Sequence, residues 1–419
     1  MLIIKNAHIP GHAAPTDILI ADGLIKELGP VKGVVAAQVI DAAGLIVAPG
    51  LVDGHAHFRD PGFPEKEDIF SGAAAAARGG YTSVVLMANT DPCVDNTQTL
   101  AYVLEKGRQT AINIYSMATV TQGMGGREIV DMAALAAAGA CGFSDDGKPI
   151  MDEAVATALM SAAARVDKVV ALHEEDPHYI IHAGIHEYSA SVAEYSMVER
   201  DLKLAAQTGA TVLFQHISSK AAVELIRRAK RTNPRIHAEA TPHHFSLTAT
   251  SVAQKGTLAK MNPPLRSDAD RLAIIEGIVD GTLDIIATDH APHTKAEKAQ
   301  AMADAPSGII GLETALSLAI RELVNPGFLS MADLIERMSA APARLFGLPA
   351  GHIAPGHPAD LVIFDANATW TVGEDFASKA ANSPFIGDTL PAVVCYTICG
   401  GRVVYDGGEY MSLRSRFTG

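Results

Sequence analysis

The sequence predicts an α/β protein: a (β/α)₈ barrel with a small β-sandwich domain formed by the N- and C-terminal segments. Through the middle of the chain, apolar strand-like runs alternate with alanine-rich helical stretches, a pattern typical of a parallel sheet. Eight such units fit a barrel, which typically takes ~250 residues before insertions. Each end of the chain has too few β-like runs for a stable sheet of its own, so we expect the two ends to pack together. The expected boundaries are 1–50, 51–347 and 348–419.

The individual elements follow from apolar runs bounded by turn signals. Terminal strands are expected at Leu2–Ile4, Asp17–Ile20, Leu24–Ile25, Ala359–Asp365, Ala392–Tyr396 and Arg402–Tyr405. Barrel strands are expected at Leu51–Phe58, Tyr81–Asn89, Ala111–Val120, Ala140–Asp146, Val169–Glu174, Thr211–Ser218, Ile236–His244 and Leu283–His290. The run from Leu45 to Val52 is interpreted as one buried strand that leads into the first tip. A doubly wound open sheet is the alternative, but no glycine-rich phosphate fingerprint follows the first strand.

Composition narrows the function classes. The chain of 419 residues is 48% hydrophobic and 19% charged, as in a folded soluble protein. Its net charge of −14 argues against a nucleic-acid partner, because a phosphate-binding surface needs a basic excess. No apolar stretch approaches the ~18 residues of a membrane helix. The four cysteines form no CxxC pair, so we expect reduced thiols and a cytoplasmic location.

The most informative motif is Asp-Gly-His-Ala-His-Phe-Arg-Asp-Pro-Gly at residues 53–62. Residues two apart on a strand point to the same side, so His55 and His57 present two imidazoles to one point. Arg59 is next on that side, and its planar cation suits a substrate carboxylate. The competing interpretation of Arg59 is a structural ion pair with Asp60.

Polar residues also end the later barrel strands: Asp145, Asp146, His173, His216, His243, His244, Asp289 and His290. Barrel active sites lie at the carboxyl ends of the strands, so these groups should surround one pocket. Any one of these histidines could be a hydrogen-bonded structural residue, but that explanation does not account for so many strand tips together. Imidazole and carboxylate ligands without thiolate suit Zn²⁺, with Mn²⁺, Co²⁺ or Fe²⁺ as alternatives.

The ligand candidates outnumber what one tetrahedral ion needs, which favours a dinuclear site with a bridging carboxylate. Two close cations lower the pKa of a bridging water and polarise a carbonyl, which is metal-assisted hydrolysis. Asp289 would hold a metal and carry the proton from that water to a leaving nitrogen.

Two other segments need an interpretation. Residues 294–306 are interpreted as a mobile loop near the site, and His178, His182 and His186 as one face of a helix.

The chain resembles the amidohydrolase superfamily, and within it the bacterial dihydroorotases, over nearly its full length. The motifs that carry the resemblance begin at Asp53, Met87, Phe143, His173, Gln215, Thr241, Met261 and Ala287. The resemblance implies that His55, His57 and Asp289 hold one metal and that His173 and His216 hold the other. Many relatives bridge the metals with a carboxylated lysine, whereas this chain looks like the branch that uses an aspartate.

Asp146 matches the bridging position by this resemblance. Asp145 is the neighbour most easily confused with it, and strand alternation allows only one of the two to face inward. Lys148 as a carboxylated bridge is a weaker alternative, because the family pattern puts the bridging group earlier. His243 and His244 receive a supporting role from the same resemblance.

The resemblance also implies the substrate contacts. Arg59 and Asn89 match residues that hold the dihydroorotate carboxylate, while Asn262 and His293 match positions that line the ring. Turn formation is the competing interpretation of Asn89 and Asn262. Ser307 departs from the pattern, since relatives commonly carry an aromatic residue there. Backbone groups of Ser307 and Gly308 are still expected to contact the substrate.

The function implied is reversible hydrolysis of (S)-dihydroorotate to N-carbamoyl-L-aspartate in de novo pyrimidine biosynthesis, with two Zn²⁺ per subunit. Alternatives are a dihydropyrimidinase, hydantoinase or allantoinase, or a metal-free scaffold for aspartate transcarbamoylase. The expected partners are the small-molecule substrate, a second copy of the chain and aspartate transcarbamoylase. Nucleic acid and membrane are not expected.

Overall fold

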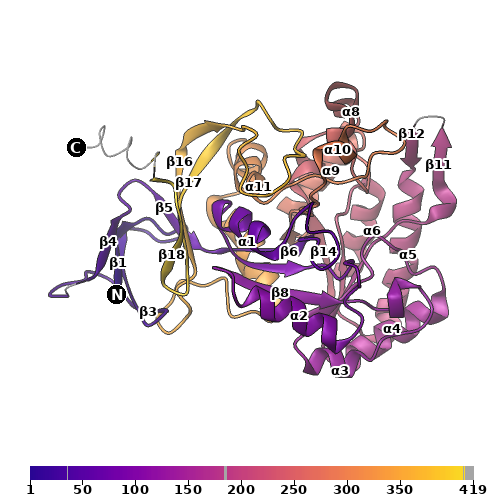
Figure 1. Cartoon of the computed structure of the whole chain (residues 1–419), viewed down its shortest axis with the longest axis horizontal. Helices are drawn as coiled ribbons and strands as arrows, with labels where there is room; N and C mark the ends of the chain where they lie inside the picture. Colours follow the sequence, from indigo (N-terminus) through magenta and orange to yellow (C-terminus); the bar gives the residue numbers. More distant parts are fainter. Residues whose placement is uncertain (35, 184–185, 409, 411–419) are drawn as a thin grey trace.

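The computed structural model describes residues 1–34, 36–183, 186–408 and 410, and for 181–183 and 186–189 it describes the backbone alone. Its central sheet has eight parallel strands in the order β15-β14-β13-β10-β9-β8-β7-β6. Their bounds are Leu51–Ala56 (β6), Tyr81–Leu86 (β7), Asn113–Ala118 (β8), Gly142–Phe143 (β9), Val169–Leu172 (β10), Val212–Phe214 (β13), Ile236–Ala240 (β14) and Ile285–Ile286 (β15). A parallel bridge between Ala56 and His290 joins the two edges, and the His57 N–H donates to the His290 carbonyl at 2.8 Å. The predicted (β/α)₈ barrel is therefore confirmed (Figure 1).

All eight predicted barrel strands are present, and every one except β6, which includes His55, ends before the predicted polar residues at its tip. The first strand was predicted to reach Phe58 and ends at Ala56. The seventh was predicted to reach His244 and ends at Ala240, because Pro242 begins the short helix α7 (Pro242–Ser246). Apart from His55, the predicted polar residues therefore lie just beyond the carboxyl ends of the strands.

Helices follow the strands and surround the barrel (Figure 1). The main ones are α1 (Ile69–Arg78), α2 (Thr97–Gly107), α3 (Met132–Ala137), α4 (Glu153–Arg165), α5 (Ser191–Thr208), α6 (Lys220–Lys230), α9 (Asp268–Val279), α11 (Ala315–Ala319) and α13 (Ala341–Phe346). Several begin at a side-chain cap: Asp68, Asn96 and Asp152 accept hydrogen bonds from first-turn N–H groups of α1, α2 and α4. These caps fix where each loop over the barrel mouth ends.

The terminal segments form two four-stranded sheets, β3-β2-β1-β4 and β18-β17-β16-β5. The strands are β1 (Leu2–Ala7), β2 (Thr16–Ala21), β3 (Leu24–Leu28), β4 (Gln38–Asp41), β5 (Ile46–Pro49), β16 (Leu361–Thr371), β17 (Thr389–Cys399) and β18 (Arg402–Asp406). One apolar core joins them, with Ile4 and Ile18 from the first sheet and Val47, Ile363 and Ile398 from the second. The predicted β-sandwich built from both chain ends is therefore confirmed (Figure 1).

The apolar run from Leu45 to Val52 is not one strand, contrary to the prediction. Its first part is β5, which pairs with β16 in the terminal sheet, and its second part is β6 in the barrel. The chain passes between the sheets at Gly50, where a Cβ atom would lie 2.1 Å from the Thr82 hydroxyl. Periodicity could not locate this break, because both halves are equally apolar.

Two further predictions are corrected. The segment with His178, His182 and His186 is not helical: it is the 3₁₀ turn Pro177–Tyr179 followed by the antiparallel hairpin β11 (Ile180–Ala183) and β12 (His186–Ser189). The side chains of His182 and His186 lie outside the described residues. The loop at 294–306 contains the short helix α10 (Lys295–Lys298).

Two lysines hold the loop that follows α10. The Lys260 ammonium donates to the carbonyls of Met302 and Ala305, both at 2.7 Å. The buried Lys298 ammonium donates to the Pro306 carbonyl at 2.9 Å and to the Gly308 carbonyl at 3.0 Å. The backbone at Gly308 is therefore fixed by charged donors.

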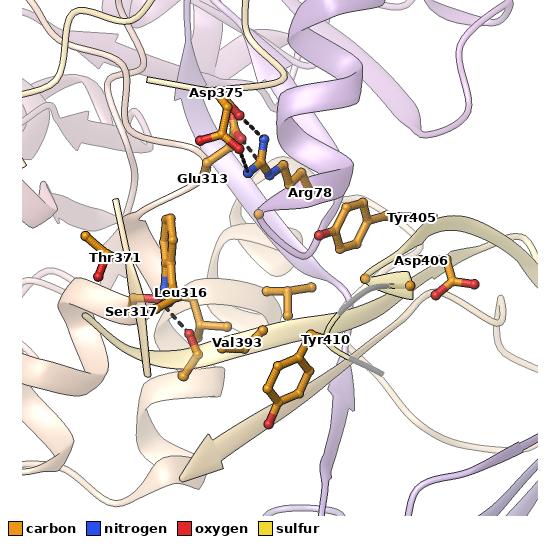
Figure 2. Close-up of a pocket in the computed structure, with 16 residues that line it drawn as sticks. Arg78, Glu313, Leu316, Ser317, Thr371, Asp375, Val393, Tyr405, Asp406 and Tyr410 are labelled. Atoms are coloured by element: carbon orange, nitrogen blue, oxygen red, sulfur yellow. Dashed lines mark hydrogen bonds and ion pairs between the residues drawn. The ribbon is translucent and has the colours of Figure 1, made fainter. Parts of the chain in front are cut away.

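A cavity of about 530 Å³ lies where α1, α11 and the β16–β18 sheet meet. Figure 2 shows Arg78 directed at Glu313 and Asp375, and the Arg78 Nε lies 3.2 Å from a Glu313 carboxylate oxygen. The Trp370 indole on another wall donates to the Ser317 hydroxyl at 3.1 Å. None of the polar strand-tip residues lines this cavity, so it lies apart from the candidate site.

None of the four cysteines, all of which lie in the described part of the chain, forms a disulfide. Among the described residues, no helix combines the length and apolarity needed to span a membrane.

Candidate metal centre and active site

Four imidazoles and two carboxylates converge at the carboxyl end of the barrel. They are His55, His57, Asp146, His173, His216 and Asp289, the six residues predicted as metal ligands. Each is buried, with at most 8% of its surface exposed. Because His55 lies at the end of β6 and the others lie in the loops after β6, β9, β10, β13 and β15, the barrel brings them together.

One group consists of His55, His57 and Asp289, whose potential ligand atoms lie within 4.8 Å of one another. The Asp289 carboxylate is 3.1 Å from His57 Nε2 and 3.5 Å from His55 Nε2. Asp289 has a φ of +49°, a strained value for an aspartate that turns its side chain back over the barrel. These three residues match the set predicted for the first metal.

The second group consists of His55, Asp146 and His216, again within 4.8 Å. His173 joins it, because its Nδ1 lies 3.0 Å from His216 Nε2 and 3.7 Å from the Asp146 carboxylate. Asp146 also lies 3.4 Å from His57 Nε2 and 3.6 Å from His55 Nε2, so it touches both groups. That central position is the one a bridging carboxylate requires.

Asp145 and Lys148 lie outside this cluster. Asp145 accepts hydrogen bonds from the Val120 N–H at 2.8 Å and the Thr121 N–H at 3.2 Å, and also from the Thr121 hydroxyl. Lys148 donates to the Met124 carbonyl at 3.4 Å. Asp145 therefore holds the loop after β8, and Asp146 alone of the two aspartates faces the histidines.

The electrostatics of the cluster favour bound cations. Although burial opposes ionisation, His55, His173 and His216 hold the pKa of Asp146 well below its usual range. Asp289 behaves alike: burial raises its pKa, but His55 and His57 outweigh burial and lower it. Burial lowers the pKa of His173, yet Asp146 and Glu175 raise it to about 9. A site that draws protons onto buried imidazoles has an excess of negative charge.

Unsatisfied atoms support the same conclusion. His55 Nε2 and one Asp146 oxygen are buried without a hydrogen-bond partner, and both face the cluster. Buried polar groups are almost always hydrogen-bonded or coordinated to a metal, so these atoms fit ligands of an ion. The residues present therefore fit a divalent metal bound by imidazole and carboxylate.

Arg59 lies beside the candidate metal ligands and does not pair with Asp60. Its Nε donates to the Pro292 carbonyl at 3.3 Å, and its terminal nitrogen lies 3.4 Å from His293 Nε2. Asp60 instead accepts from Lys106 Nζ at 2.5 Å and from the Tyr102 hydroxyl at 2.9 Å. The structure therefore contradicts the competing interpretation of Arg59 as the partner of Asp60 in a structural ion pair.

The two predicted asparagine contacts also border the cluster. Asn89 accepts from His57 Nδ1 at 2.9 Å and donates to an Asp146 oxygen at 3.3 Å. Asn262 donates to Glu175 at 2.8 Å. A cavity of about 610 Å³ opens beside Asn89 and Asp146 and provides space next to the cluster.

His293 and Ser307 are hydrogen-bonded to each other next to Arg59, and Gly308 follows Ser307 in the chain. His293 Nε2 lies 2.8 Å from the Ser307 carbonyl, to which it donates. Burial and the nearby Arg59 cation lower the pKa of His293 to about 3, so its ring is neutral. The Gly308 N–H donates to the Lys260 carbonyl at 2.9 Å. The Ser307 carbonyl, part of the backbone predicted to contact the substrate, therefore positions His293.

The supporting roles of His243 and His244 have a structural basis. His244 lies 2.7 Å from the Thr241 hydroxyl and 3.0 Å from the Pro263 carbonyl, which links the loops after β14. Burial lowers the pKa of His243 to about 4, so that ring is neutral.

Sequence reasoning missed three residues that contact the site. Glu239 of β14 accepts from His55 Nδ1 at 2.6 Å, and the Gln215 amide nitrogen lies 3.2 Å from the same atom. Asn382 accepts from the His293 N–H at 3.1 Å and donates to the Gly308 carbonyl at 3.2 Å. A charged residue in the middle of a buried strand could have revealed Glu239. The sequence around Asn382 carries no comparable signal.

Comparison with known proteins agrees with this geometry. Residues 46–404 match the Amidohydrolase family. A dihydroorotase of Clostridioides difficile (strain 630) is 49% identical, covering 97% of this chain and 100% of that protein. A dihydroorotase of Lactococcus lactis subsp. lactis (strain IL1403) is 45% identical, covering 96% and 99%.

Solved structures give the same class. L-Hydantoinase (dihydropyrimidinase) from Arthrobacter aurescens aligns with a TM-score of 0.89 at 25% identity over 97% of this chain and 96% of that one. The chain therefore belongs to the amidohydrolase family, as a metal-dependent cyclic amidohydrolase. Its predicted resemblance to bacterial dihydroorotases is confirmed by relatives of that name along nearly the whole chain.

Proposed function

We propose that this chain is a dihydroorotase, which interconverts (S)-dihydroorotate and N-carbamoyl-L-aspartate in de novo pyrimidine biosynthesis. The observation that carries the proposal is Arg59, a half-buried cation beside the histidine–aspartate cluster that does not pair with the neighbouring Asp60 carboxylate. Dihydroorotate carries a carboxylate on a ring carbon two positions from the amide carbonyl carbon that is cleaved. A guanidinium fixed on one side of the cluster is suited to orient that carboxylate.

We infer two Zn²⁺ per chain: His55, His57 and Asp289 would hold one, His173 and His216 would hold the other, and Asp146 would serve both. The charge balance supports two ions. Three buried carboxylates lie together here, those of Asp146, Asp289 and the adjacent Glu239. A single divalent cation does not compensate the negative charge of all three. When bound, such a pair supplies an activated water and polarises the substrate carbonyl.

The residues of the chain supply orientation and proton transfer. Arg59 binds the substrate carboxylate, and neutral His293, held by Ser307, lines the ring beside it. Asn262 lines the opposite side, where Glu175 fixes its amide. Asp289, kept ionised by its imidazole neighbours, accepts a proton at its carboxylate and delivers it to the leaving ring nitrogen.

Two other functions compete. A hydantoinase or dihydropyrimidinase is favoured by the structural likeness to L-hydantoinase, but those cyclic amides lack a carboxylate for Arg59. A non-catalytic scaffold for aspartate transcarbamoylase would not need six convergent ligand candidates, and the complete cluster counts against it.

The deciding experiment compares hydrolysis of dihydroorotate, dihydrouracil, hydantoin and allantoin by the metal-loaded protein. We expect kcat/KM to be highest for dihydroorotate. A preference for an uncharged cyclic amide would overturn the assignment, and inactivity on all four with full metal content would support the scaffold.

Assembly and location are further proposals from the family resemblance. We expect a cytoplasmic homo-oligomer that can associate with aspartate transcarbamoylase, with residues 51–347 as the catalytic barrel between sandwich segments 1–50 and 348–419. Light scattering of the protein alone and with the transcarbamoylase tests both associations.

A further inference from the structure

We propose that Glu239 is a positioning residue of the metal centre, which fixes the protonation of His55 and the backbone of His216. Its carboxylate is fully buried in the barrel below the cluster. One oxygen lies 2.6 Å from His55 Nδ1 and accepts the His216 N–H at 3.0 Å. A single atom therefore contacts a candidate ligand of each metal. The inference rests on the proposed metal centre.

The contact with His55 determines which ring nitrogen is free to bind a metal. Glu239 is the nearer partner of His55 Nδ1, at 2.6 Å against 3.2 Å for the Gln215 amide nitrogen, and a carboxylate only accepts hydrogen bonds, so this contact places the proton of His55 on Nδ1. Its Nε2 then carries the lone pair and faces Asp146 at 3.6 Å and Asp289 at 3.5 Å. Without Glu239, the proton could equally lie on Nε2 and block the ligand atom. A carboxylate behind a metal-binding histidine also makes the imidazole a stronger ligand.

The contact with His216 acts on the backbone. His216 has a φ of +33°, a conformation that a histidine rarely adopts. The hydrogen bond from its N–H to Glu239 helps to hold that conformation, which directs Nε2 to within 3.0 Å of His173 Nδ1 and 3.5 Å of Asp146. Loss of Glu239 should therefore loosen the second group as well.

Substitution of Glu239 separates these effects by direct measurement of Zn²⁺ affinity, in competition with a chromophoric chelator. Glu239→Met removes both hydrogen bonds, and we expect Zn²⁺ to bind about 10- to 100-fold more weakly. Glu239→Gln keeps an acceptor oxygen without the charge, so its loss should be smaller. Glu313→Gln is the matched control, since it neutralises another buried glutamate whose contacts lie with Arg78, Ala377 and Ser378. We expect the control to leave Zn²⁺ affinity unchanged.

A spectroscopic measurement distinguishes positioning from general stability. In the Zn²⁺-loaded wild type with ¹⁵N-labelled histidine, we expect a downfield proton on His55 Nδ1, which Glu239→Met loses. In Glu239→Gln, kcat should fall with metal occupancy while KM for dihydroorotate stays nearly constant, because Arg59 is unaltered. Zn²⁺ affinity of Glu239→Met within twofold of wild type would refute the proposal.

If neither Glu239 variant folds, the wild-type spectrum still decides, since a His55 proton on Nε2 contradicts the geometry. Zn²⁺ affinity and the position of this proton do not depend on which cyclic amide is hydrolysed. A failure of the dihydroorotase assignment is therefore distinguishable from a failure of this inference.

Discussion

Replacement of Arg59 by methionine should selectively impair the substrate that carries a carboxylate. Arg59 is held by the Pro292 carbonyl and has no ion pair with Asp60, so its remaining donors are available to a ligand. A hydrogen bond to a charged group contributes about 1.5–3 kcal/mol, and a bidentate guanidinium–carboxylate pair makes two. A loss of about 3–4 kcal/mol lowers kcat/KM for dihydroorotate by roughly 10²- to 10³-fold.

The assay compares two substrates in two variants. Dihydrouracil is the same ring without the carboxylate, so Arg59→Met should change its kcat/KM little. If the wild type hydrolyses dihydrouracil too slowly to measure, the inhibition constants of orotate and uracil give the same comparison. Arg78→Met is the control, because Arg78 is a half-buried arginine paired with Glu313 away from the cluster (Figure 2).

An equal loss on both substrates would refute the carboxylate role, since it would show that Arg59 supports the metal centre or the fold. An unchanged KM and kcat for dihydroorotate would refute it as well. Metal content and the midpoint of thermal unfolding, measured for each variant, separate these outcomes from simple instability.

Four further predictions concern the centre and the loop beside it. Asp289→Asn should lower kcat by about 10²- to 10⁴-fold with a smaller change in KM, as expected for loss of a general acid–base; near-normal kcat in this variant would contradict the mechanism. Dialysis against a chelator should abolish activity, Zn²⁺ should restore it, and elemental analysis should find two ions per active chain. Gly308→Ala should raise KM for dihydroorotate about tenfold. Gly308 has a φ of +119°, and the new Cβ would lie 2.7 Å from Ala291 and 3.3 Å from His293, a strain of roughly 1–3 kcal/mol. An unchanged KM would show that this backbone does not orient His293. Burial and the Lys260 charge lower the pKa of Lys298 to about 8, so the folded protein loses this proton at a lower pH than the unfolded chain does. The free-energy cost of burying the charged ammonium is therefore relieved as the pH rises from 8 to 10.5. Urea unfolding should therefore show the wild type gaining up to about 3 kcal/mol over Lys298→Met across that range, and a constant difference would contradict the shift.

The sequence predicted the barrel and its ligand set because both leave local patterns. Apolar runs of strand length mark the eight strands, and a polar residue after each run marks a strand tip. Strand alternation also limited the choice between Asp145 and Asp146 to one inward-facing residue. These signals are short-range, so a single sequence is enough to read them.

Contacts between distant segments left no such pattern. Asn382 reaches the His293 backbone across 89 positions of sequence, from a segment without regular secondary structure. The break at Gly50 depends on Thr82, and the fixed loop at Pro306 depends on Lys298 through two carbonyls. Each of these features is determined by which segments the barrel places side by side.

Arg59 shows why the most specific part of the site needed the structure. Adjacent Arg59 and Asp60 are an obvious ion pair in sequence, yet an arginine φ of +58° turns the two side chains to different partners. Asp60 faces α2, where Lys106 and Tyr102 satisfy its carboxylate, and Arg59 faces Pro292. Because Lys106 on α2 neutralises Asp60, the Arg59 guanidinium remains available to bind a substrate anion. The substrate preference of this site therefore depends on Lys106 as well, a residue that no metal motif includes.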